Sequence, residues 1–154
     1  MFMHGGLLHI GGNMLFLWVF GNNVEDRLGP IAFTLFYVFT GIVATGAHVA
    51  LNLDSTVPMI GASGAIAGVM GAYLVFWPHA RILSVVPLFF ILQFVRLPAG
   101  VVLGLWFVMQ FFTNPNSGVA WAAHVGGFVA GALIALGLRP FQSSSRPHPA
   151  PEWR

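Results

Sequence analysis

Long apolar runs, separated by short segments rich in glycine, proline or polar residues, dominate the chain. They cover Leu7 to Phe20, Ile31 to Leu51, about Pro58 to Trp77, Leu97 to Phe112, and Val119 to Leu138. A helix of roughly twenty apolar residues, rising about 1.5 Å per residue, crosses the roughly 30 Å hydrocarbon core of a bilayer. The pattern therefore predicts about five transmembrane helices.

Two segments do not follow this pattern. Val85 to Phe94 is apolar but short, and arginines and prolines flank it, which favours an interfacial or re-entrant piece over a span. From Pro140 onward the chain is polar and rich in serine and proline. We therefore expect a transmembrane domain over residues 1–139 and a disordered cytoplasmic tail over residues 140–154.

Composition agrees with a membrane protein. The chain is 57% hydrophobic and only 6% charged, which is more apolar than a soluble domain of this size requires. We expect an all-α integral membrane protein. The absence of cysteine excludes thiol catalysis and thiolate metal sites. No cofactor and no metal are expected, because His4 and His9 lie five residues apart on different helix faces and no carboxylate joins them.

The basic residues are all arginines, too few to indicate nucleic-acid binding, and they act as topology signals. They are Arg27, Arg81, Arg96, Arg139, Arg146 and Arg154. With five spans, all of them fall on one side of the membrane, which the positive-inside rule makes cytoplasmic. We expect a multi-pass protein of the plasma (inner) membrane with a cytoplasmic C-terminus. An external N-terminus without a cleavable signal indicates a preceding span that this chain lacks.

The same topology brings three polar residues to a common depth. His9, Ser63 and His124 each lie one or two helical turns in from the external side of their spans. Five residues of penetration is only about 7 to 8 Å. That depth suits a water-filled depression opening outward, and hydrolysis in a membrane needs such access to water.

Small residues give two of these spans a way to meet. Gly61, Gly64, Gly68 and Gly71 repeat at helical spacing around Ser63, and Ala123, Gly127, Ala130 and Gly131 do so around His124. Small-residue stripes let membrane helices approach closely. Ser63 and His124 could then come within hydrogen-bond distance, although either residue could instead be a plain packing or interhelical contact.

If they meet, the pattern favours acyl transfer. Ser63 would attack a peptide carbonyl, and His124 would take and return the proton. His9 and Asn13, four residues apart on one helix face, could join the Ser63 backbone N–H as donors to the oxyanion. No carboxylate is placed to complete a triad, so a Ser63/His124 dyad is the economical interpretation.

These residues resemble the rhomboid intramembrane serine proteases. The matching pieces are His4, His9 and Asn13 at their spacing, Gly61-Ala62-Ser63-Gly64, Ala123-His124-Val125-Gly126-Gly127 with Gly131, and Glu25 with Gly29. The resemblance implies a polytopic helical bundle without a cofactor. Its implied roles are Ser63 as nucleophile, His124 as base, and His9 with Asn13 as oxyanion-hole donors. His4 is implied to be structural and Glu25 a cytoplasmic contact, and the implied substrates are single-span membrane proteins.

The chain departs from the family's pattern in two places. The family core has six spans, and this chain resembles it only from the second onward, without the first helix and first external loop. Ala67 stands one turn after Ser63, where some members have a tyrosine against the histidine. Two other functions remain open: an inactive rhomboid-like protein that binds membrane helices, and a proton-coupled transporter that uses histidines as relays.

Overall fold

The first apolar run forms a helix that continues well beyond it. The computed structural model describes residues 1–56, 58–88, 90–114 and 118–139. In it, α1 (Leu7–Phe16) passes through the π-helical turn η1 (Leu17–Gly21) directly into α2 (Asn22–Leu28). The predicted polar segment after Phe20 is therefore helical and not a loop. The side chain of Val24 is completely buried in the hydrophobic core. This burial holds the polar stretch against the core and explains why it continues the helix.

Two helices are long and apolar enough to cross a bilayer. They are α3 (Pro30–Leu51) and α6 (Trp121–Leu138), and both end where the apolar runs end. Gly29, with a φ of 81°, separates α2 from α3, and Pro30 occupies the first position of α3, where its missing N–H has no helical partner to lose. The helices α4 (Ser63–Phe76) and α5 (Ala99–Gln110) are apolar but shorter.

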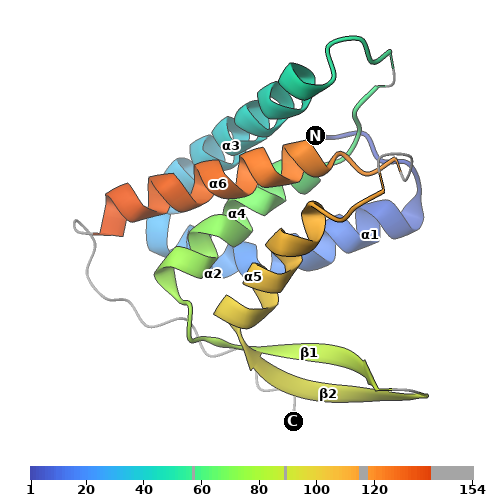
Figure 1. The fold of residues 1–154 in the computed structure, drawn as a ribbon. Helices are drawn as coiled ribbons and strands as arrows, with labels where there is room; N and C mark the ends of the chain where they lie inside the picture. The colour runs from blue at the N-terminus through green and yellow to red at the C-terminus, as the bar shows by residue number, and fades with distance from the viewer. Residues whose placement is uncertain (57, 89, 115–117, 140–154) are drawn as a thin grey trace.

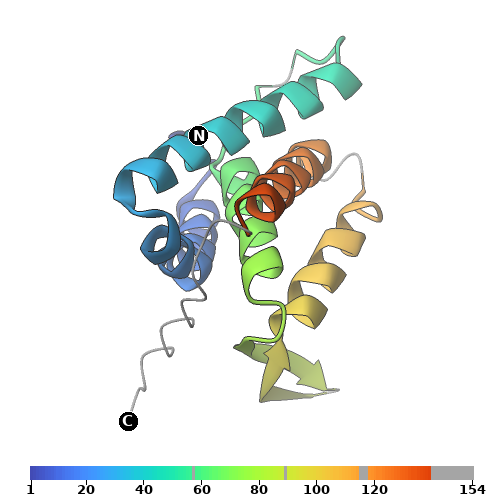
Figure 2. The same cartoon turned by 90° about the vertical axis from the view of Figure 1, so that its left-hand side faces the viewer.

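Helix α4 is the centre of the molecule. It contacts α1, η1, α2, α3, α5 and α6, and Figures 1 and 2 show it enclosed by the other helices. Every residue from Ala65 to Tyr73 is buried. A helix that is apolar around its whole circumference is suited to such a position. Ser63 therefore belongs to the most enclosed helix of the fold.

The start of α4 differs from the predicted third span. The apolar run begins near Pro58, but the helix begins only at Ser63. Gly61 adopts a φ of +106°, and its N–H donates to the carbonyl of Met3 at 2.8 Å. A left-handed residue bonded to a different part of the chain cannot continue a helix. Ser63 consequently lies at a helix N-terminus, not one or two turns inside a span.

A β-hairpin joins α4 to α5. Strand β1 (Arg81–Leu88) pairs with antiparallel β2 (Ile91–Pro98), with Arg81 opposite Pro98 and Leu88 opposite Ile91. The sequence predicted an interfacial or re-entrant piece over Val85 to Phe94 but did not predict strands. Its content of valine and isoleucine explains the extended conformation. Its expected position at the membrane interface stays a prediction.

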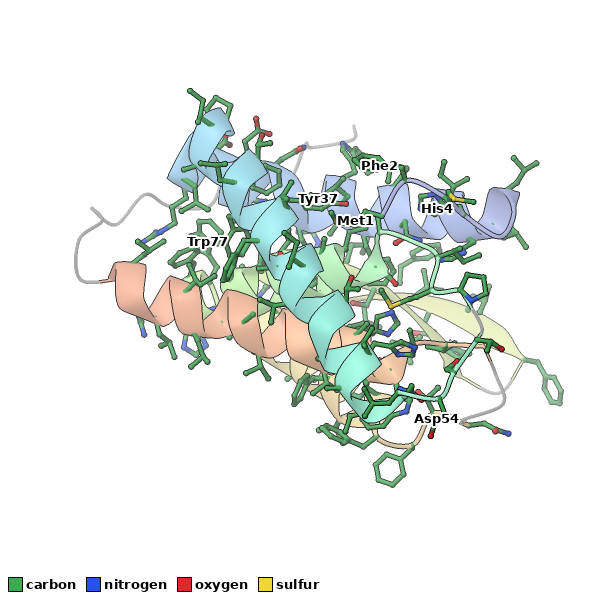
Figure 3. The ribbon with its side chains drawn as sticks, turned by 90° about the horizontal axis from the view of Figure 1, so that it is seen from above. Met1, Phe2, His4, Tyr37, Asp54 and Trp77 are labelled. Atoms are coloured by element: carbon green, nitrogen blue, oxygen red, sulfur yellow. The ribbon has the colours of Figure 1, made fainter. Side chains whose placement is uncertain are left out.

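The two ends of α4 lie at opposite ends of the molecule. Figure 3 places Trp77, directly after α4, far from Asp54 in the loop between α3 and α4, and far from His4.

The predicted tail over residues 140–154 lies outside the described residues, as do Arg146 and Arg154.

Candidate active site

Ser63 and His124 are in direct contact. His124 lies in the first turn of α6, and its Nε2 atom is 2.8 Å from Oγ of Ser63, the first residue of α4. This distance is typical of a hydrogen bond between a hydroxyl and a ring nitrogen. The structure thus joins two residues that are 61 positions apart in the sequence.

Close approach of α4 and α6 produces this contact. A Cβ atom at Gly127 would fall on the carbonyl oxygen of Gly64, and one at Gly131 would fall on that of Gly68. Helix α3 approaches the same place, because a Cβ at Gly64 would lie 2.7 Å from Cβ of Ala44 and 3.6 Å from Cβ of Ala123. Backbones this close leave room only for glycine, so the helices fix the separation of Ser63 and His124.

Gly61 lies close to both His9 and Ser63. Its φ of +106° lies in a region that side chains rarely adopt, and a Cβ there would lie 2.7 Å from Nε2 of His9. Position 61 therefore brings the loop before Ser63 against the His9 ring. The backbone N–H groups at the start of α4 have no carbonyl partner within the helix and carry its positive dipole end.

His9 and Asn13 both lie on α1, and the His9 ring is the one that faces this loop. The Gly5 N–H donates to Nδ1 of His9 at 3.2 Å, and the Asn13 amide donates to the His9 carbonyl at 2.8 Å. Asn13 is buried, with 7% of its surface exposed. Four residues of separation put the two side chains on one face of α1, as expected from the sequence.

His4 packs against His9. The two rings meet edge to face with centroids 5.2 Å apart. The Nε2 atom of His4 is buried and, among the described residues, has no hydrogen-bond partner. In the described part of the chain, no group of three or more histidines, cysteines or carboxylates could hold a metal ion.

Glu25 lies at the other end of the molecule. It belongs to α2, and Arg27 of the same helix places its guanidinium 4.1 Å from the ring centroid of Phe76, the last residue of α4. Since Ser63 begins α4 and the helix is about 21 Å long at 1.5 Å per residue, Glu25 is remote from the Ser63–His124 pair.

His124 has a second polar partner that sequence reasoning missed. Its Nδ1 atom is 2.8 Å from Oε1 of Gln110, the last residue of α5, and the Gln110 Nε2 atom donates to the carbonyl of Trp106 at 3.0 Å. The Trp106 ring also packs on the His124 ring, with centroids 5.7 Å apart. The sequence does indicate that Gln110 has a partner, because a lone amide in an apolar helix is costly in a membrane unless it is hydrogen-bonded.

A small cavity adjoins Ser63. Its volume is about 20 Å³, and its lining includes Ser63, Gly61, Thr45, Ala120 and Ala123. A single water molecule needs roughly 10 to 15 Å³ by this measure. The cavity is therefore large enough for one water next to the serine hydroxyl.

Comparison with known proteins identifies the family. The Rhomboid domain family matches residues 1–141. The chain is 35% identical over 138 residues to "Rhomboid protease GluP" of Bacillus subtilis (strain 168), covering 88% of this chain and 25% of that protein. It is 31% identical over 137 residues to "Rhomboid protease GlpG" of Serratia proteamaculans (strain 568), covering 88% of this chain and 45% of that protein.

A plant protein gives a similar match. "Rhomboid-like protein 11, chloroplastic" of Arabidopsis thaliana is 30% identical over 150 residues, covering 94% of this chain and 52% of that protein. The chain thus spans between a quarter and about half of these relatives. Its match to the family nevertheless runs from the first residue to beyond α6. The chain belongs to the rhomboid family, a family of polytopic helical membrane proteins.

Proposed function

We propose that this protein is an intramembrane serine endopeptidase that cleaves single-span membrane proteins in or near their transmembrane helix. The observation that carries the proposal is the 2.8 Å contact between Oγ of Ser63 and Nε2 of His124. Both bacterial relatives described above bear the name rhomboid protease, which supports the same class of activity.

Acylation would begin at Ser63. As Oγ attacks the scissile carbonyl carbon, Nε2 of His124 takes the hydroxyl proton and the carbonyl oxygen becomes negative. The Ser63 N–H, at the positive end of α4, is suited to donate to that oxygen. His9 and Asn13 are the proposed side-chain donors from α1. His124 then gives its proton to the departing amine, and the peptide bond breaks.

Deacylation would use water. A water next to Ser63, for which the adjoining cavity has room, would attack the ester carbonyl while His124 accepts its proton. The carboxylic acid product would then leave, and the proton would return to Oγ of Ser63. The cycle needs no cofactor and no metal.

The contact pattern favours an enzyme over a helix-binding protein without activity. An inactive relative would have no need to keep Ser63 and His124 in hydrogen-bond contact. A proton relay in a transporter would need titratable groups along a path through the membrane. The pairing of Ser63 with His124 at one end of α4 and α6 favours acyl transfer over such a relay.

A cleavage assay tests this proposal. The whole chain is reconstituted in liposomes with a single-span substrate, and its products are compared with those of Ser63→Ala and of Ser84→Ala, a matched change in the hairpin. We expect cleavage by the wild type and by Ser84→Ala and none by Ser63→Ala. Equal cleavage by wild type and Ser63→Ala would show that Ser63 is not the nucleophile.

A further inference from the structure

Gln110 is buried, and both polar atoms of its side-chain amide have hydrogen-bond partners. Only 7% of its surface is exposed. Its Nε2 atom is 3.0 Å from the Trp106 carbonyl, one turn back on α5, and its Oε1 atom is 2.8 Å from Nδ1 of His124 on α6. The amide therefore connects the backbone of one helix to the imidazole of another.

These partners fix the direction of every hydrogen bond in the chain of contacts. A backbone carbonyl can only accept, so the amide NH₂ must face Trp106 and the amide oxygen must face His124. An amide oxygen also only accepts, so Nδ1 of His124 must carry the proton. A neutral imidazole has one N–H, which leaves Nε2 as an acceptor for the Ser63 hydroxyl.

We propose that Gln110 is a positioning residue that holds His124 in the tautomer needed for a general base. The inference rests on the proposed protease function. A carboxylate usually orients a catalytic histidine. In this protein the neutral amide of Gln110 occupies that position. When His124 takes the Ser63 proton, both ring nitrogens become donors, and Oε1 of Gln110 still accepts from Nδ1.

The aromatic contact supports the same role. Trp106 supplies the carbonyl that orients Gln110, and its ring also packs on the His124 ring with centroids 5.7 Å apart. One turn of α5 thus restrains the imidazole both in its plane and against its face. A ring held from two directions loses little freedom when the reaction begins.

The experiment compares Gln110→Met, which keeps the length of the side chain but removes the amide, with Gln110→Glu, which restores an oxygen acceptor. Gln93→Met, at the exposed Gln93 of β2, is the matched control. The whole chain carries ¹⁵N-labelled histidine in liposomes, and the ring signals of His124 are identified by their loss in His124→Ala. The tautomer, kcat and KM are measured for each variant.

We expect the Nδ1–H tautomer of His124 in the wild type and in Gln93→Met. Gln110→Met should lose this preference, and its kcat should fall about ten- to a hundred-fold with KM unchanged, by analogy with the loss of partners that orient metal-bound histidines. Gln110→Glu should restore the Nδ1–H tautomer and part of kcat. A merely structural role would not change the tautomer or be rescued by an acceptor.

Two results would overturn the inference: Gln110→Met with the wild-type tautomer and kcat, or an Nε2–H tautomer in the wild type. The second result decides the matter even if Gln110→Met does not fold. Failure of the proposed function looks different. A wild-type chain that has the Nδ1–H tautomer but cleaves no substrate would contradict the protease proposal and support the hydrogen bond to Gln110.

Discussion

At the scale of single residues, the position of Ser63 at the start of α4 decides what its hydroxyl can do. Hydroxyls inside membrane helices commonly donate to the carbonyl four residues back, as Thr34 does to Pro30 at 2.8 Å and Thr45 does to Gly41 at 2.9 Å. Ser63 has no helical residue four positions earlier. Its hydroxyl is consequently available to Nε2 of His124.

The oxyanion-hole proposal predicts a specific effect of Asn13→Ala. Loss of one donor to a developing oxyanion lowers kcat by about a hundred- to a thousand-fold. Because the interaction strengthens in the transition state, KM should change little. The measurement is steady-state cleavage of a single-span substrate in liposomes.

Asn52→Ala is the control for this variant. The Asn52 amide donates to the His48 carbonyl at 2.9 Å, the same local bond that Asn13 makes to His9 at 2.8 Å, but at the end of α3. If the two variants lose equal amounts of activity, Asn13 contributes only a local helix bond.

Sequence patterns predicted one contact of the candidate site and missed another. Ser63 and His124 could be predicted because each lies in a run of small residues with helical spacing. Gln110 could not, because its partner His124 is 14 positions away on another helix and no spacing rule connects them. A polar residue in an apolar run shows that a partner exists but not which partner.

At the scale of secondary-structure elements, the contact between α4 and α6 depends on missing side chains. A Cβ at Gly71 would fall on the carbonyl of Phe128, continuing the contacts made at Gly127 and Gly131. The glycines thus form a continuous seam along both helices. This seam holds Ser63 and His124 at hydrogen-bond distance, so damage to it should reach the site.

Gly131→Ala tests the seam. The added methyl would collide with the Gly68 carbonyl, so we expect a loss of stability of about 1 to 3 kcal/mol and reduced cleavage. Gly137→Ala is the control on the same helix, since nothing lies within 4 Å of a Cβ there. Thermal unfolding in detergent measures the stability of both variants. Equal unfolding temperatures would contradict the role of the seam.

Hydrophobic patterns located the helices better than their ends. The limits of α3 and α6 follow the apolar runs within one or two residues, because lipid-facing positions must be apolar along the whole span. The continuation into α2 depends on one buried side chain, Val24, and the late start of α4 on the backbone of Gly61. Neither tertiary contact can be deduced from apolar run length.

At the scale of the whole molecule, the arginines named below and the candidate active site lie at opposite ends of α4. The guanidinium of Arg27 lies over the Phe76 ring at 4.1 Å, at the end of the helix that Ser63 begins. The hairpin with Arg81 and Arg96 also follows that end. This separation supports our proposal that the arginine end faces the cytoplasm and the site opens to the external side.

The absence of cysteine makes this orientation easy to test. Asp54→Cys places a thiol in the exposed loop before α4, and His79→Cys places one in the exposed segment after it. A membrane-impermeant thiol reagent should label Asp54→Cys in intact cells and His79→Cys only in inverted vesicles. The reverse pattern would contradict the proposed orientation.

The most direct test of the Ser63–His124 pair is the site of a covalent adduct. The whole chain in liposomes is treated with a fluorophosphonate, digested and mapped by mass spectrometry, beside His124→Ala and the exposed-site control His79→Ala. We predict one adduct, on the Ser63 hydroxyl, in the wild type and His79→Ala, and its loss in His124→Ala. Labelling of His124→Ala at the wild-type rate would contradict the role of His124 as the base. An unlabelled Ser63 in a chain that still cleaves substrate would contradict its role as the nucleophile.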